Sequence, residues 1–170
     1  MFERSEVAVA ENYFLKPGYI LVPKEPTVIS TVLGSCVAVC LYDRKRKAGG
    51  MNHFQLPSIS RLEEATARYG NVSTLALIGM MLDDGSKIKN LDAQVFGGAF
   101  QPKTGPKNVG SENIRTARMI LRRKRIPIVS EDVGGEKGRK VVYNTTTNEV
   151  AVIRVDKIRQ GDWFPYIDNR

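Results

Sequence analysis

The fold is decided by the stretch Val37-Ala38-Val39-Cys40-Leu41-Tyr42, which a charged turn connects to Gly49-Gly50-Met51-Asn52-His53. The first run is apolar on both faces of an extended chain, which is typical of a strand buried on both sides. Asp43 to Arg46 form a loop of four residues between the two runs, an ordinary length for a hairpin connection. The sequence therefore predicts an antiparallel hairpin with a buried first strand.

The register of this hairpin decides whether Cys36 faces His53. Opposed residues of an antiparallel pair have a constant sum of residue numbers and project to the same face. A register that opposes Cys36 to His53 also pairs Tyr42 with Lys47, and it separates the two Cβ atoms by about 5 Å. A second register stays open, in which residues 47–50 belong to a longer turn and His53 is displaced from Cys36.

Cys36 and His53 are candidates for a thiol nucleophile and its base. His53 is the only histidine in the chain, and a thiol with a pKa of about 8.5 needs a neighbouring imidazole to ionise at neutral pH. Gly34 permits an unusual backbone angle, and N–H groups at Gly34 and Ser35 can face a developing oxyanion. The alternative is that Cys36 is inert packing in an apolar strand, which is also our interpretation of Cys40.

The cysteines also limit the class of site and the compartment. Four residues apart in one strand, their sulfurs are separated by roughly 13 Å, too far for a disulfide. Free thiols are typical of a reducing compartment, and two cysteines with one histidine are too few for a structural zinc site, so we expect no metal. The chain has neither a run typical of a membrane span nor a signal-peptide pattern at its amino terminus, so we expect a cytoplasmic protein without membrane insertion.

The charge of the chain indicates an acidic partner. Lysine and arginine exceed aspartate and glutamate by 26 to 18, which gives a net charge of +8. The densest basic runs, residues 44–47 and 122–125, contain no aromatic side chains that would stack on bases, so we do not expect nucleic-acid binding. We interpret these runs as a solvated turn and a solvated helix end.

The remaining periodicities predict a mixed set of elements. Helices are expected over residues 60–69, 72–82 and 112–124. The second helix is expected to bury the stripe Leu75, Ile78, Gly79 and Leu82, to be capped by Asn71 or Ser73 and to end at Asp84-Gly85. The third helix is expected to be capped by Ser111 and to bury the stripe Ile114, Ala117, Ile120 and Leu121. Strands are expected over residues 19–22, 27–31, 37–42, 93–96, 127–133, 140–144 and 149–155. A long loop is expected after Gly97-Gly98, through Pro102, Gly105 and Pro106.

These elements predict an α+β fold, with mixed, largely antiparallel β-sheet layers flanked by helices. We expect one domain over residues 1–156 and a C-terminal tail over residues 157–170.

A series of short motifs runs in order from about residue 7 to residue 155. They are the run Leu33 to Asp43, Gly50-Met51-Asn52-His53, Leu56-Pro57, Phe96-Gly97-Gly98-Ala99, Asn108-Val109-Gly110 with Asn113, and Glu131-Asp132-Val133-Gly134-Gly135 followed by Arg139 to Asn144. This ordered set resembles the CheD family of chemoreceptor glutamine deamidases. Any one glycine pair would be weak evidence, but the set in this order is specific.

The resemblance implies hydrolysis of receptor glutamine side chains to glutamate and ammonia, with Cys36 as nucleophile, His53 as base and no cofactor. The family's third residue is a hydroxyl six positions before the cysteine. That position is Ser30 here, with Thr31 beside it, and the sequence leaves open which of them orients His53.

The resemblance further implies a fold similar to the deamidase domain of the cytotoxic necrotizing factor toxins. It implies chemoreceptors (methyl-accepting chemotaxis proteins) as substrates, and in many systems the CheC phosphatase as a partner. Two alternatives remain: a receptor methylesterase that uses the same acyl chemistry, and a non-catalytic adaptor that binds receptors or CheC through its basic surface.

Overall fold

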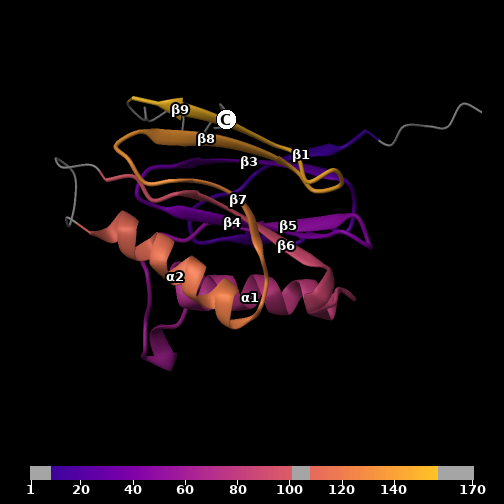
Figure 1. Ribbon diagram of the computed structural model, residues 1–170, viewed down its shortest axis with the longest axis horizontal. Coiled ribbons are helices and arrows are strands. Elements are labelled where there is room, and N and C mark those ends of the chain that lie inside the picture. The colour runs from indigo at the N-terminus through magenta and orange to yellow at the C-terminus, as the bar shows by residue number, and fades with distance from the viewer. Residues whose placement is uncertain (1–8, 101–107, 157–170) are drawn as a thin grey trace, which may run out of the picture.

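The computed structural model describes residues 9–100 and 108–156, which form two stacked β-sheets with two helices on one side (Figure 1). The first sheet has the strand order β1 (Glu11–Phe14), β3 (Thr27–Leu33), β8 (Gly138–Asn144) and β9 (Val150–Val155). The second sheet has the order β2 (Ile20–Leu21), β5 (Ala48–Asn52), β4 (Val37–Asp43), β6 (Leu91–Gly97) and β7 (Ile128–Val133). Helices α1 (Gly70–Asp83) and α2 (Val109–Arg123) cover the outer face of the second sheet, and η1 (Leu62–Glu64) and η2 (Ile88–Asn90) are single 3-10 turns.

The predicted α+β class with mixed, largely antiparallel sheets is confirmed. The pairs β1–β3 and β6–β7 are parallel, and the other strand pairs of the described residues are antiparallel. The proposed tail, residues 157–170, and the expected loop residues Pro102, Gly105 and Pro106 lie outside the described residues. No helix in the described part of the chain is long and apolar enough to cross a membrane.

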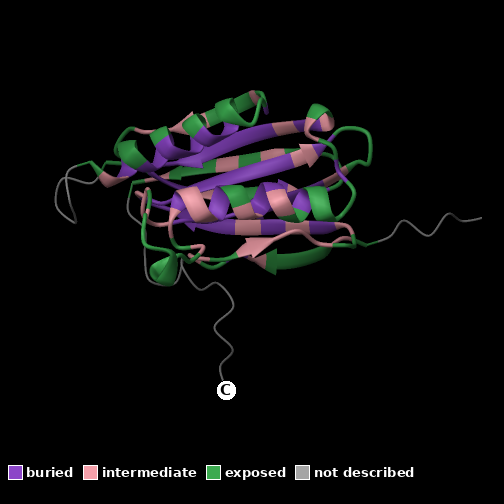
Figure 2. Cartoon of the chain, turned by 90° about the horizontal axis from the view of Figure 1, so that it is seen from below, coloured by how far each residue is buried: buried purple, intermediate pink, exposed green. Residues whose placement is uncertain are grey.

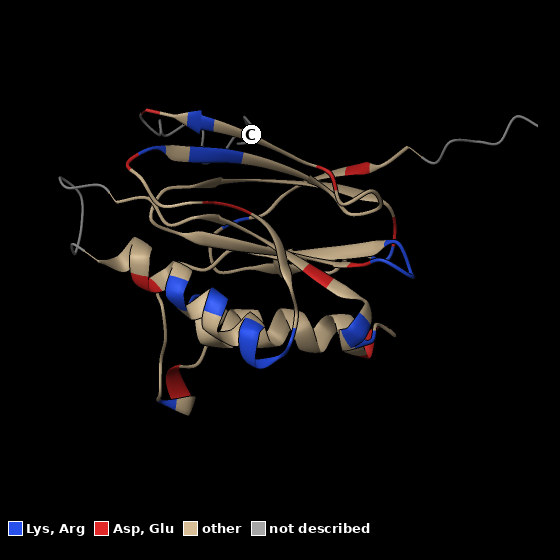
Figure 3. Ribbon diagram, viewed as in Figure 1, with Lys and Arg blue, Asp and Glu red and all other residues tan. Residues whose placement is uncertain are grey.

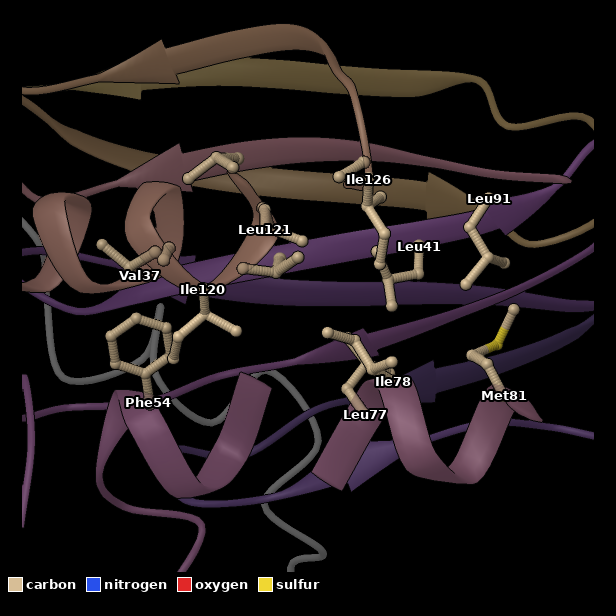
Figure 4. Packing of buried hydrophobic residues seen from close by; sticks show 14 of the residues in the cluster. Val37, Leu41, Phe54, Leu77, Ile78, Met81, Leu91, Ile120, Leu121 and Ile126 are labelled. Atoms are coloured by element: carbon tan, nitrogen blue, oxygen red, sulfur yellow. The ribbon is translucent and has the colours of Figure 1, made fainter. Parts of the chain in front are cut away.

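Strand β4 is buried on both faces, as the sequence predicts (Figure 2). Its odd-numbered residues Val37 and Leu41 belong to the core between this sheet and the helices, where they lie with Phe54 (Figure 4). Its even-numbered residues Ala38 and Cys40 belong to a second core between the two sheets. The inter-sheet core also contains Cys36, so the candidate nucleophile points between the sheets.

The predicted helix 72–82 and its end at Asp84 are confirmed, and Ile78 of the predicted stripe is buried. The rest of the stripe and the cap are wrong, since Asn71 and Ser73 both lie inside a helix that begins at Gly70. Leu75 and Leu82 are 46% and 37% exposed, and the helix instead buries a neighbouring face that includes Leu77 and Met81. Most sides of this helix carry apolar side chains of its own, so the spacing of apolar residues alone did not identify the buried side. Asn71 makes no cap, because its side chain bonds the backbone N–H and C=O of Ile59.

Helix α2 buries its predicted stripe and ends at Lys124 as expected, but it begins at Val109 with Asn108 as the N-cap residue, ahead of Ser111. The predicted helix over residues 60–69 is wrong, since this segment forms only the single turn η1. That turn buries none of its side chains, and a short helix without a packed face is unstable in water.

The predicted register of the β4–β5 hairpin is also wrong, by two residues. Cys40 pairs with Met51 and Asp43 with Ala48, which leaves residues 44–47 as the loop. The cause is the turn chemistry of Asp43, whose carboxylate accepts the backbone N–H groups of Lys45 and Arg46 at 2.9 and 3.0 Å and so starts the turn one residue later. Because side chains alternate between the two faces of a sheet, a register shift of two residues keeps every side chain on its predicted face.

Candidate active site

Cys36 and His53 lie on the same face of the sheet, displaced along it. An isolated bridge pairs Val37 with Phe54, so Cys36 lies opposite Gln55 and His53 lies opposite Ala38. The two candidates are therefore diagonal neighbours, whose Cβ atoms are typically about 7 Å apart. Both side chains point into the space between the sheets, where Cys36 is 8% exposed and His53 is fully buried.

The hydroxyl of Thr31 holds the His53 ring from the opposite sheet. Its Oγ1 lies 2.7 Å from Nδ1 of His53 and 2.7 Å from the backbone carbonyl oxygen of Leu15. Thr31 has one hydroxyl proton and donates it to the carbonyl, so its oxygen accepts the proton of Nδ1–H. Nε2 is then the bare nitrogen, and it is buried with no hydrogen-bond partner among the described residues.

Ser30, the other candidate hydroxyl, lies on the opposite side of the pleat from Thr31, because successive side chains of a strand alternate in direction. It is half-buried, whereas Thr31 is 1% exposed. Of the two hydroxyl residues, Thr31 is the one that bonds His53.

The backbone of His53 is held on the side away from β4. Its N–H donates to the carbonyl of Tyr19 at 3.1 Å, and its carbonyl accepts from Gly18 at 2.8 Å. At the neighbouring position the side-chain oxygen of Asn52 accepts the N–H of Val39 at 2.7 Å, in place of a backbone carbonyl. The histidine is thus fixed by the chain segment before β2 as well as by Thr31.

Burial keeps both candidate groups neutral. Desolvation raises the pKa of the Cys36 thiol to about 11, although its own backbone N–H opposes the shift, and desolvation lowers the pKa of His53 to about 3. At neutral pH the site therefore contains a thiol and an uncharged imidazole. Cys40 is fully buried and its pKa is also raised by desolvation, which suits a packing residue.

The bend before Cys36 is held by its carbonyl groups. The carbonyl of Gly34 accepts the N–H of Ala99 at 2.9 Å, and the carbonyl of Ser35 accepts the side-chain amide of Asn113 at 2.9 Å. The N–H of a trans peptide points opposite to its C=O, so the amides of Ser35 and Cys36 point away from these two partners. The N–H of Cys36 also favours its own thiolate.

Glycine at position 97 allows β6 to approach this bend. Gly97 has φ 103°, and a Cβ there would overlap the carbonyl oxygen of Cys36. That carbonyl accepts the N–H of Gly98 at 2.8 Å. From the sequence, the glycine pair was expected to open a loop and to belong to a family motif, and neither expectation includes this close approach.

Leu15 and Asn113 are site residues that the sequence did not predict from chemistry. Leu15 acts through its backbone carbonyl, which no side-chain pattern reveals. Asn113 lies 78 residues from Ser35 along the chain, and its only signal was its place in a family motif. No group of three or more His, Cys, Asp or Glu residues that could hold a metal ion occurs in the described ranges.

Comparisons with known proteins agree on one family. The family model described as CheD chemotactic sensory transduction matches residues 55–154. A probable chemoreceptor glutamine deamidase CheD 1 of Anaeromyxobacter dehalogenans is 44% identical over 133 residues, 77% of each chain. Probable chemoreceptor glutamine deamidases CheD of Trichlorobacter lovleyi and Rhodospirillum rubrum are 42% and 41% identical, over 84% and 92% of this chain and 90% and 92% of their own.

Proposed function

We propose that this chain, which belongs to the CheD family, is a chemoreceptor glutamine deamidase. The reaction is the hydrolysis of a glutamine carboxamide to glutamate and ammonia. The enzyme class rests on the curated relatives. The assignment of roles to Cys36, His53 and Thr31 is our proposal.

One observation carries this assignment: His53 presents a bare, unpartnered Nε2 in a buried space that it shares with Cys36. An unpaired polar atom in a protein interior costs free energy, and a reaction in which Nε2 takes the proton of the Cys36 thiol gives this unpaired nitrogen a function. The matched family segment begins at residue 55, so the geometry of Cys36 and His53 is an argument independent of that match.

The first half of the mechanism is acylation. The Cys36 sulfur attacks the carboxamide carbon while its proton passes to Nε2 of His53, and the C=O electron pair moves onto oxygen. The N–H groups of Ser35 and Cys36 hold the oxyanion. His53 then gives its proton to the departing nitrogen, the C–N bond breaks, ammonia leaves and a thioester remains.

The second half is hydrolysis of the thioester. Nε2 of His53 takes a proton from water as the water oxygen attacks the carbonyl carbon, and the C–S bond then breaks. The proton returns to the sulfur, which restores the thiol. Thr31 keeps Nδ1 protonated and the ring in place throughout. No step requires a metal or an organic cofactor.

The neutral resting pair has a kinetic consequence. With a thiol pKa of about 11 and an imidazole pKa of about 3, a standing thiolate–imidazolium pair is disfavoured before substrate arrives. Proton transfer is therefore coupled to attack on the carboxamide, when the oxyanion donors first have a charge to stabilise. We expect slow alkylation of Cys36 at neutral pH in the free protein.

The direct test is mass spectrometry of a chemoreceptor fragment incubated with the protein. Conversion of an amide to an acid adds about 1 Da per glutamine, and we expect this gain to disappear in Cys36→Ala, which lacks the nucleophile. Cys40→Ala is the matched control, because Cys40 of β4 faces the same core between the sheets as Cys36 and should retain activity when changed. A mass gain that persists in Cys36→Ala, or no gain with any chemoreceptor of the source organism, would refute the proposal.

A second candidate, an adaptor that binds receptors or the CheC phosphatase, has one observation in its favour. A hollow of about 570 Å³ lies between α2 and β7, lined by Arg118, Arg122, Ile126 and Val129 among others, and α2 presents several basic residues (Figure 3). An adaptor requires that Cys36→Ala leaves chemotaxis intact while Arg122→Glu impairs it. A deamidase requires that Cys36→Ala alone impairs it.

Three finer points belong to the same proposal. The fold is similar to the deamidase domain of the cytotoxic necrotizing factor toxins, residues 1–156 form the catalytic domain with residues 157–170 as a tail, and the protein works in the cytoplasm. The two free, buried cysteines support a reducing location.

A further inference from the structure

An exposed arm extends from the body of the protein close to the candidate active site. The arm comprises residues 57–68, includes the turn η1, and projects beyond the helices (Figure 1). None of its residues is buried (Figure 2). At its tip Leu62 is 89% exposed.

The base of the arm is bonded to the site. The arm begins four residues after His53. Its two ends are closed by hydrogen bonds from the N–H groups of Gln55 and Leu56 to the carbonyl of Arg68, at 2.9 and 3.1 Å. Asn113 then donates its side-chain amide to the carbonyls of both Gln55 and Ser35, at 3.0 and 2.9 Å. One fully buried side chain therefore fixes the arm relative to the bend that carries Cys36.

The turn at the tip of the arm contributes little to the stability of the fold. Its 3-10 turn buries no residue, and its ion pair, Arg61 with Glu64 at 3.7 Å, is exposed on both sides. A single exposed leucine on a flat surface needs no explanation. Leu62 differs, because it lies at the tip of a segment whose base is held against the nucleophile.

We propose that the arm is a docking element for the substrate protein, with Leu62 entering an apolar contact on the receptor that brings its glutamine to Cys36. This inference rests on the proposed deamidase function and names its substrate class. The partner is a protein surface that offers an apolar site near the glutamine, with charges of both signs around it to meet Arg61, Glu63 and Glu64. A short glutamine peptide that occupies only the site at Cys36 does not use the contact at Leu62.

The test compares Leu62→Ser with Leu82→Ser. Leu82 is 37% exposed at the far end of α1, and that helix of 14 residues separates it from the arm by about 20 Å. With a receptor fragment as substrate, Leu62→Ser should raise KM about tenfold, the effect of losing one buried leucine, and leave kcat unchanged. Hydrolysis of a blocked short glutamine peptide should not change, and Leu82→Ser should match the wild type on both substrates.

The outcomes separate this inference from the function on which it rests. If wild-type protein deamidates neither substrate, the proposed function fails. If it deamidates the receptor fragment and Leu62→Ser does so with unchanged KM, the docking role is refuted. Light scattering measures the oligomeric state of wild type and Leu62→Ser. A difference between them would also refute the docking role, since the arm would then join two copies of the chain.

Discussion

At the scale of single residues, the hydroxyl proton of Thr31 decides which nitrogen of His53 acts as the base. Donation from Thr31 to the Leu15 carbonyl places the ring proton on Nδ1 and leaves Nε2 bare. Thr31→Val removes this acceptor, and we expect a loss of about a hundredfold in kcat, as for removal of general-base catalysis, with mixed tautomers of the ring. Because His53 is the only histidine, nitrogen NMR of histidine-labelled, untagged protein reports its tautomer without overlap.

Two neighbouring variants complete that prediction. Thr31→Ser keeps the hydroxyl and should keep both the tautomer and most of the activity. Ser30→Ala changes the hydroxyl on the opposite side of the pleat and should leave the histidine spectrum as in the wild type. A histidine spectrum that changes in Ser30→Ala and not in Thr31→Val would show that the hydrogen bonds from His53 to Thr31 and from Thr31 to the Leu15 carbonyl do not set the tautomer.

At the scale of elements, the contact between β6 and the Cys36 bend depends on a residue without a side chain. Gly97→Ala should destabilise the protein by about 1–3 kcal/mol, because a positive φ and a clash with a backbone oxygen act together. Gly79→Ala is the matched control, since a Cβ at this position of α1 meets nothing within 4 Å. It should stabilise the helix by about 0.5–1 kcal/mol.

Urea unfolding measures both glycine variants. Loss of receptor deamidation should accompany Gly97→Ala even under conditions where the variant is folded, because the carbonyl of Cys36 must move. If Gly97→Ala and Gly79→Ala had equal stability, the close approach at Gly97 would be unimportant.

The hairpin shows how far the sequence predicts these elements. The alternation of side chains along the two strands predicted correctly that Cys36 and His53 lie on the same face of the sheet. A shift of the register by two residues leaves each side chain on that face. The register itself depended on the side chain of Asp43, which a count of loop residues does not include. The bonds made by Leu15 and Asn113 join distant segments, so local patterns contained no sign of them.

At the scale of the whole molecule, burial of an uncharged imidazole links folding to pH. The pKa of His53 falls from 6.5 to about 3 on burial, so the unfolded chain binds a proton in a range where the folded chain does not. A group whose folded pKa is lowered contributes stability above its unfolded pKa and loses it as the pH falls toward the folded value. Stability should therefore decline below pH 6.5, well before most carboxylates are protonated.

The expected size of this decline is about 2 kcal/mol between pH 7.5 and pH 5, which corresponds to one proton taken up on unfolding over about 1.5 pH units. Urea unfolding at a series of pH values measures it. His53→Gln is less stable at pH 7.5, because it loses the bond to Thr31, but its stability should be nearly flat over the same range. No other side chain of the sequence ordinarily titrates between pH 5 and pH 7, so an equal slope in wild type and variant would mean that His53 is protonated, and therefore solvated, in the folded protein.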